Sequence, residues 1–161
     1  MYASKSLHLS AKFMNSFRII KHPPVFTCEE ANICMKNVVE GKSKNLFLRN
    51  KKWNTHYLVC VSDDNRGDLK ELTIILDPSN LSFASPERLM KYLWVTPRSV
   101  TPFWFITDSQ SEVICIFDEK LFSHELVYFH PNRNDVTLEL KTSDFLKYCK
   151  NLGNKIEILN I

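Results

Sequence analysis

The alternation of apolar and polar positions along the chain predicts strands mixed with short helices. Residues 16–21 form a short apolar run that ends before two prolines, which predicts a strand. Thr27 then begins a helix, because its hydroxyl can cap the first turn and Glu30, three residues on, can reach back. We expect this helix to extend to about Val39, with Gly41 stopping it.

The central part of the chain carries the pattern of a hairpin followed by two helices. Residues 45–50 and 56–62 are rich in apolar, β-branched and aromatic residues, and residues 49–54 supply a polar turn between them. Helical spacing follows Asp68, which is a good N-cap. Ser85-Pro86-Glu87 is a strong helix start, because proline suits the first turn. The apolar face of this second helix would carry Leu89, Met90 and Leu93.

The last third of the chain predicts further strands and one more helix. Thr142 or Ser143 caps that helix, and Gly153 ends it. Strands and helices are mixed rather than strictly alternating, so we expect an α+β fold: a mixed or mostly antiparallel sheet with flanking short helices. A length of 161 residues is typical of one domain, so residues 1–161 are expected to form a single one. The predicted strands are residues 113–117, 126–129, 136–140 and 155–159.

Composition and charge narrow the function classes. Hydrophobic residues make up 44% of the chain, which is ordinary for a globular protein, and a net charge of +3 does not by itself indicate a nucleic-acid partner. The five cysteines include no Cys-x-x-Cys pair, and their apolar neighbours predict buried free thiols rather than a zinc site. No apolar run approaches the ~18 residues of a membrane span. The basic, Ser-rich start allows organellar targeting, but arginine is scarce there, so we expect a cytoplasmic protein.

Three features could carry chemistry. Lys44 precedes an apolar strand, where it could meet a phosphate or carbonyl, or could simply keep a strand edge soluble. His130 suits a general base with a pKa near neutral or a structural residue at a strand end. A basic cluster with aromatic neighbours could track an RNA backbone, although a solvated hairpin turn would look the same. The cluster and its neighbours are Lys42, Lys44, Arg49, Lys51, Lys52, Trp53, His56 and Tyr57.

Three short stretches together point to a family. They are Ser43-Lys44-Asn45-Leu46-Phe47-Leu48-Arg49-Asn50, Thr96-Pro97-Arg98-Ser99-Val100-Thr101-Pro102 and Phe129-His130-Pro131-Asn132. With them the chain resembles the prolyl-tRNA synthetase-associated (YbaK-type) editing domains, from about Phe17 to Ile161. The free-standing branch that deacylates alanine misattached to proline tRNA is the most similar. The resemblance implies ester hydrolysis without metal or cofactor and without a membrane. It implies the acceptor end of proline tRNA as partner and allows prolyl-tRNA synthetase as a second one.

The resemblance also implies roles for individual residues. Lys44 would hold the terminal adenosine end and polarise the ester. Ser99 belongs to a loop whose backbone N–H groups would face the substrate, so both residues are assigned to catalysis. Substrate binding is assigned to Phe26, Thr27, Asn45, Arg98, Val100, Thr101, Pro102 and His130. Contact with the tRNA is assigned to Arg49, Lys51 and Lys52.

The sequence departs from the family pattern at three glycines. Arg98 stands in a loop that normally reads Gly-Ser-Val-Thr-Pro, and Trp94 and Trp104 replace two others. Where such a position needs a positive φ, a residue other than glycine costs of order 1 kcal/mol or more. Two hypotheses therefore stand: an active trans-editing deacylase, and a catalytically impaired paralogue that binds tRNA without turnover.

Overall fold

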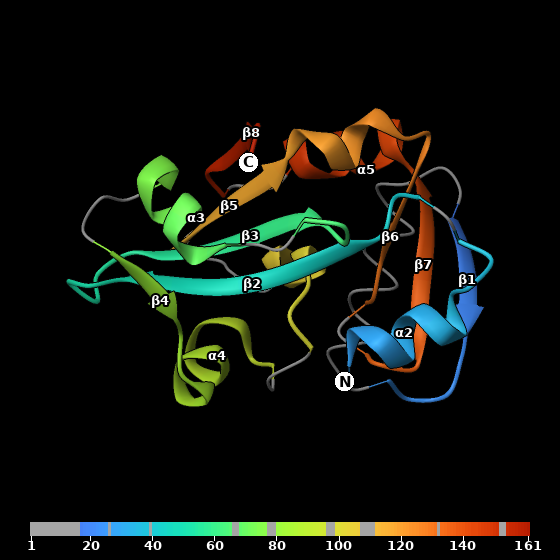
Figure 1. The fold of residues 1–161 in the computed structure, drawn as a ribbon, viewed down its shortest axis with the longest axis horizontal. Coiled ribbons are helices and arrows are strands. Elements are labelled where there is room, and N and C mark those ends of the chain that lie inside the picture. The colour runs from blue at the N-terminus through green and yellow to red at the C-terminus, as the bar shows by residue number, and fades with distance from the viewer. Residues whose placement is uncertain are drawn as a thin grey trace.

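The computed structural model describes residues 17–25, 27–38, 40–65, 68–76, 80–95, 99–106, 112–131, 133–151 and 154–161. Figure 1 shows its elements. The strands are β1 (Phe17–Lys21), β2 (Ser43–Asn50), β3 (His56–Ser62), β4 (Leu81–Phe83), β5 (Val113–Asp118), β6 (Leu126–Phe129), β7 (Val136–Lys141) and β8 (Ile156–Leu159). The helices are α2 (Cys28–Cys34), α3 (Leu69–Leu76), α4 (Pro86–Leu93) and α5 (Thr142–Lys150), with two 3-10 turns, η1 (Pro102–Ile106) and η2 (Glu119–Ser123).

The described strands form two sheets. A three-stranded sheet has the order β1-β7-β6, and both of its pairs are antiparallel. A five-stranded sheet has the order β4-β2-β3-β5-β8, in which β2 pairs antiparallel with β4 and β3, while β5 pairs parallel with β3 and β8. The expected α+β class with a mixed sheet is therefore confirmed.

The predicted hairpin of β2 and β3 forms the centre of the larger sheet. On one face, Phe47 packs in the core with residues of α4 and α5, such as Leu89 and Phe145. On the other face, Leu48 packs with Leu72 of α3. Figure 1 accordingly shows α3 and α4 on opposite sides of the β2–β3 pair. Each face of β2 is thus covered by a different part of the chain.

Helix α2 begins as predicted and ends earlier than predicted. Thr27 accepts a hydrogen bond from the Glu30 N–H at 3.1 Å, and the Glu30 carboxylate returns a bond to the Thr27 N–H, which confirms the capping box. The helix stops at Cys34, with Met35 as its C-cap, so the predicted extension to about Val39 is wrong. Gly41 instead has a φ of 77° beside the Leu126 carbonyl, and its own carbonyl accepts from the Tyr128 N–H. It therefore joins the start of β2 to β6.

Other local expectations also needed correction. Met90 is 46% exposed, so it does not share the buried face of α4 with Leu89 and Leu93. The N-cap of α5 is Lys141, because the Thr142 hydroxyl donates to the His124 carbonyl instead of capping the helix. Strand β4 and both 3-10 turns were not predicted, since each has too few residues to show a period. Gly153 lies outside the described residues. Cys60, Cys115 and Cys149 are buried, as expected, whereas Cys34 is only partly buried.

Candidate functional site

A small cleft lies where the start of β2 meets β6, β7 and α2. Its volume is about 130 Å³. Val25, Ala31 and Met35 form an apolar wall on the α2 side. The cleft thus combines this apolar wall with a polar lining. Its polar lining consists of His22, Lys42, Ser43, Lys44, Asp63, Tyr128, His130, Asn134 and Thr137.

Lys44 brings a positive charge to this cleft from within β2. Its backbone is fixed by pairing with Val61 of β3. Its Nζ donates to the Asn65 carbonyl at 3.2 Å, and the described residues provide it with no carboxylate partner. The pKa of Glu29 in α2 is lowered, first by the backbone N–H of Glu29, then by Thr27, and more weakly by Lys44. An ammonium has three donors, so Lys44 keeps donors for a ligand.

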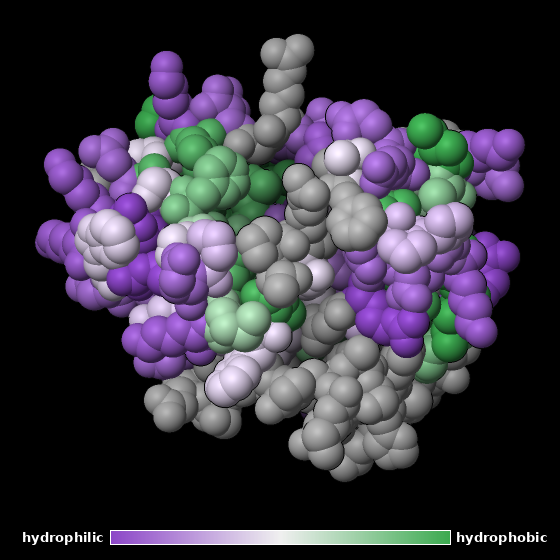
Figure 2. Space-filling model, turned by 90° about the horizontal axis from the view of Figure 1, so that it is seen from below, coloured by the Kyte–Doolittle hydropathy of each residue, from purple (hydrophilic) through white to green (hydrophobic). Residues whose placement is uncertain are grey.

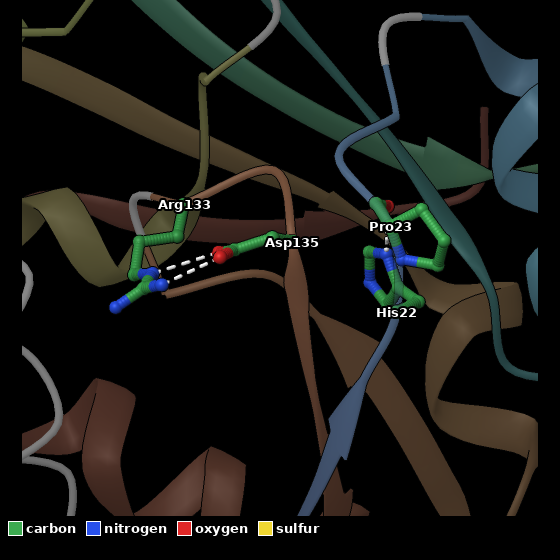
Figure 3. A network of polar contacts seen from close by, with 4 residues as sticks. All are labelled: His22, Pro23, Arg133 and Asp135. Carbon is green, nitrogen blue, oxygen red and sulfur yellow. Dashed lines mark hydrogen bonds and ion pairs between the residues drawn. The ribbon is translucent and has the colours of Figure 1, made fainter.

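His22 is a cleft residue that sequence reasoning did not assign to the site. Its Nδ1 lies 2.9 Å from the Pro23 carbonyl oxygen, and because a carbonyl only accepts, Nδ1 carries a proton (Figure 3). In the neutral ring Nε2 then accepts from the Thr137 hydroxyl at 3.0 Å. Figure 3 also shows Arg133 pointing to the Asp135 carboxylate, which it binds through two hydrogen bonds. This end of the molecule is thus held by internal polar contacts.

His130 lies in the same cleft as a neutral imidazole. Loss of solvent lowers its pKa to about 4; a hydrogen bond to the Val100 backbone opposes this shift and the charge of His22 adds to it. Its Nδ1 is buried and has no hydrogen-bond partner within the described ranges. A base with a pKa near 4 takes few protons at pH 7, which argues against the near-neutral general base and favours a positioning residue.

Residues 99–102 lie beside His130 and are held by their buried side chains. Thr101 is fully buried, and its hydroxyl donates to the His130 carbonyl at 2.6 Å. Pro102 is buried as the first residue of η1, and Ser99 is half-buried. None of these three side chains lines the cleft, so the loop is connected to it through the backbone of His130.

Asn45 and Val100 line a second pocket, of about 300 Å³, beside α4. Successive residues of a strand point to opposite faces, which separates Asn45 from Lys44. The Oδ1 atom of Asn45 is buried there without a hydrogen-bond partner in the described part of the chain. The two neighbouring residues of the Lys-Asn motif therefore serve different pockets.

Among the remaining predicted substrate residues, Thr27 does not line the cleft. Thr27 is exposed, and its hydroxyl is used as the cap of α2. Phe26 and Arg98 lie outside the described residues, so the structure gives no account of either.

The predicted tRNA-binding residues lie at the far end of β2. Arg49 is five residues from Lys44, which corresponds to about 17 Å along a strand. Its guanidinium carbon is 3.5 Å from the centre of the Trp53 ring. Lys51 and Lys52 are exposed in the turn that follows. The structure therefore places these cations together, and away from the cleft.

The two tryptophans that replace family glycines have different environments. Trp94 caps α4 with a φ of 53°, a left-handed conformation that favours glycine, and is 60% exposed. Trp104 is 1% exposed and belongs to the main core. The large residue at position 104 is thus built into the fold, whereas Trp94 occupies a backbone conformation of the glycine type.

Tyr128 is a second cleft residue that was not assigned from the sequence. Val127 and Phe129 of β6 are buried in the core, so strand alternation puts Tyr128 on the opposite side together with His130. The Tyr128 hydroxyl donates to Glu139, and burial, followed by this carboxylate, raises its pKa to about 12. The alternation of buried and polar positions over residues 126–130 could have indicated that Tyr128 lies on the same side as His130.

Two other kinds of site are absent from the described residues. No group of three or more His, Cys, Asp or Glu side chains among them could hold a metal ion. No helix in the described ranges is both long and apolar enough to cross a membrane.

Comparison with known proteins gives consistent similarities. Residues 22–148 match the model of the aminoacyl-tRNA editing domain. The chain is 38% identical to the prolyl-tRNA editing protein ProX of Acetoanaerobium sticklandii over 91% of this chain and 89% of that protein. It is 35% identical to the prolyl-tRNA synthetase associated domain-containing protein 1 of Bos taurus, covering 88% and 85%. A crystal structure described as a candidate trans-editing enzyme for prolyl tRNA synthetase has a TM-score of 0.72 at 19% identity, covering 99% and 97%.

Proposed function

The chain belongs to the aminoacyl-tRNA editing domain family, and we propose that it hydrolyses mischarged proline tRNA in trans, with alanine as the amino acid removed. The relative named as a prolyl-tRNA editing protein supports proline tRNA as the substrate class. The observation that carries the proposal is that the Lys44 ammonium and the neutral His130 imidazole line the same small cleft.

The proposed reaction breaks the ester that joins the amino acid to the terminal ribose. A water molecule attacks the carbonyl carbon, a tetrahedral oxyanion forms, and the carbon–oxygen bond to the ribose breaks. The ribose oxygen takes up the proton that the water loses, so the products are the free amino acid and the free tRNA. Lys44 stabilises the developing negative charge, because a positioned cation acts strongly where water is scarce.

His130 and the neighbouring loop have positioning roles in this proposal. A neutral imidazole can accept a hydrogen bond, and the buried Nδ1 is the atom that remains available for a water or for the substrate ammonium. Ser99 contributes through its backbone N–H in this proposal, and its loop is bonded to His130 through the Thr101 hydroxyl. The Asn45 amide binds part of the terminal nucleotide in the pocket beside α4.

Selection of alanine would rest on the size of the cleft. Its apolar wall of Val25, Ala31 and Met35 suits a methyl side chain. One methylene changes binding by only ~1–3 kcal/mol, so efficient exclusion of proline requires steric conflict and not weaker attraction alone. Met35→Ala should therefore enlarge the accepted set and raise hydrolysis of correctly charged proline tRNA.

The first test measures alanine release from alanine-charged proline tRNA. We expect turnover by the wild type and a loss of about 100-fold in Lys44→Ala, a typical cost of removing one oxyanion-stabilising group. Lys147→Ala is the matched control, because Lys147 lies on α5 with its side chain 64% exposed. Full activity in Lys44→Ala would contradict the assigned role.

A second candidate, a catalytically impaired tRNA-binding paralogue, is favoured by the glycine-type conformation of Trp94. Wild type and Arg98→Gly, assayed together for alanine release, separate the two functions. Turnover by the wild type supports the deacylase. Turnover only in Arg98→Gly would identify a binding protein whose substrate loop is blocked.

A further inference from the structure

Helix α4 and the β2–β3 turn together build a cationic surface around one tryptophan. The guanidinium carbons of Arg49 and Arg88 lie 3.5 Å and 4.6 Å from the centre of the Trp53 ring. Arg49 comes from β2 and Arg88 from α4, so two segments far apart in the sequence converge on the same ring. Cations over an aromatic face are held by its negative potential, so the ring attracts both guanidinium groups despite their like charge.

His56 fixes the position of Arg88. The two side chains meet at 2.7 Å between Nη1 of Arg88 and Nε2 of His56. Arginine has donors only, so Nε2 accepts and His56 is neutral. Its ring is 2% exposed and lies between Phe47, at 5.7 Å, and Tyr92, at 4.0 Å between ring centres. Loss of solvent, followed by the charges of Arg88, Lys91 and Arg49, lowers its pKa to about 4.

More positive charge lies near Arg88 and Arg49. Lys91, one turn after Arg88, lies over the Tyr92 ring at 4.8 Å. Lys51 and Lys52 are exposed in the hairpin turn. Within the described ranges, none of these five cations takes part in an ion pair, whereas Arg18, Lys42, Arg133, Lys147 and Lys155 each pair with a carboxylate. Figure 2, which views the molecule from the α4 side, shows hydrophilic side chains at this end as well as at the other end.

Trp53 has an unusually exposed side chain for a large aromatic residue. It is 52% exposed, and its φ is 66°, a conformation in which glycine would be less strained. A large ring kept exposed on a strained backbone, and flanked by two arginines, has no evident role in packing the core. It is suited instead to support guanidinium groups that bind an external polyanion.

We propose that this surface, made by Arg49, Lys51, Lys52 and Trp53 of the hairpin with Arg88 and Lys91 of α4, binds the phosphate backbone of RNA, with Arg88 as a contact held in place by His56. The proposal rests on the proposed function and extends it: the RNA is the acceptor arm of the tRNA whose charged end occupies the cleft. The surface begins about 17 Å from Lys44, which is about five nucleotides at ~3.4 Å each.

Guanidinium groups explain why the surface suits phosphate. The planar fork of arginine binds two phosphate oxygens at once, and stacking on an aromatic ring leaves its N–H edge free to do so. Phosphate contacts bind without reading sequence. The surface should therefore add affinity and orientation, while the identity of the amino acid is read in the cleft.

The test measures binding of uncharged proline tRNA as a function of potassium chloride concentration. Each phosphate contact contributes about 0.7–0.9 to the slope of log affinity against log salt. We expect Arg88→Gln and Lys91→Gln each to lower affinity about 3- to 10-fold and to lower the slope by about that amount. Lys70→Gln is the matched control, because Lys70 is an exposed lysine on α3, on the opposite face of the sheet, and it should change neither quantity.

A second variant guards against loss of folding. Trp53→Gly removes the ring at a position whose φ favours glycine, so it should keep the melting temperature while lowering RNA affinity. Unchanged affinity and slope in Arg88→Gln, Lys91→Gln and Trp53→Gly would overturn the proposal. So would variants that keep RNA affinity and lose affinity for polyglutamate, because the partner would then be an acidic protein. Because the assay uses uncharged tRNA, it measures binding even if the protein does not deacylate its proposed substrate.

Discussion

The two ends of β2 differ in the arrangement of the charges around them. At the Lys44 end the surrounding charges are paired, as in Lys42 with Asp63, and the imidazole of His130 is neutral. At the Arg49 end five cations gather, three of them over aromatic rings, with no ion pair among the described residues. A cleft with paired charges suits chemistry on a small group, whereas an exposed row of cations suits a long polyanion. A single strand therefore separates a candidate reaction site from a candidate binding surface.

The two ends also differ in how tightly the backbone is built. At the cleft, Gly41 lies against the Leu126 carbonyl and is bonded to Tyr128, so little space is left for change. At the hairpin turn, Lys51, Lys52 and Trp53 are exposed. Substitutions at the cleft should thus cost stability, and substitutions at the turn should cost mainly affinity.

The largest expected effect is that of Gly41→Ala. A Cβ would collide with the backbone oxygen of Leu126, at a φ of 77° that other residues rarely adopt. We expect a loss of about 3 kcal/mol in the free energy of unfolding, which is in the range of strained or overpacked sites. Urea denaturation measures it. Lys51→Ala, in the exposed turn, is the comparison and should change stability by less than about 0.5 kcal/mol.

The next effect separates catalysis from binding. Lys44→Ala should lower kcat by about 100-fold, equivalent to about 2.7 kcal/mol, with a small change in tRNA affinity. Trp53→Gly should do the reverse, raising KM several-fold with a nearly constant kcat at saturating tRNA. Steady-state deacylation assays on both variants measure the two parameters. Equal changes in kcat and KM for both variants would show that the two ends of β2 act as one site.

A smaller effect concerns stability in acid. The pKa values of His130 and His56 fall from about 6.5 to about 4 on folding, so between these values the unfolded chain binds more protons than the folded one. Stability should therefore be fully present above pH 6.5 and should decline as the pH falls toward 4, by on the order of 2 kcal/mol for each histidine. Denaturation curves at pH 7 and pH 4.5 test this.

A matched variant measures how much of the loss of stability in acid comes from His56. His56→Phe keeps the stack between Phe47 and Tyr92 and removes a titrating group. Its stability should depend less on pH than that of the wild type. An unchanged dependence would show that His56 is protonated in the folded protein near pH 6 and would weaken the account of its bond to Arg88.

The smallest effect is that of the α2 cap. Thr27→Ala removes the hydroxyl that accepts from the Glu30 N–H and should cost about 1 kcal/mol. Because α2 supplies Ala31 to the cleft wall, the variant should also lose some discrimination between alanine and proline. Thermal unfolding and the two deacylation rates measure these changes, with Thr27→Ser as a control that keeps the cap.

Local sequence patterns were sufficient for the elements whose causes are local. The Thr27–Glu30 capping box, the β2–β3 hairpin and the start of α4 follow from a few adjacent residues, and all three were predicted correctly. The stretch around Lys44, together with residues 96–102 and 129–132, indicated the family. The end of α2 was missed, because Gly41 serves the contact with Leu126 and not the helix.

The sequence by itself determined the class of the fold, most of the strands and helices, and the residues that resemble those of editing domains. Tertiary structure decided which of those residues meet. It put Lys44 and Asn45 in different pockets, brought His22 and Tyr128 to His130, and carried Arg88 to Trp53. The physical reason is that periodicity fixes which face a side chain takes, whereas the neighbour across that face depends on how distant segments pack.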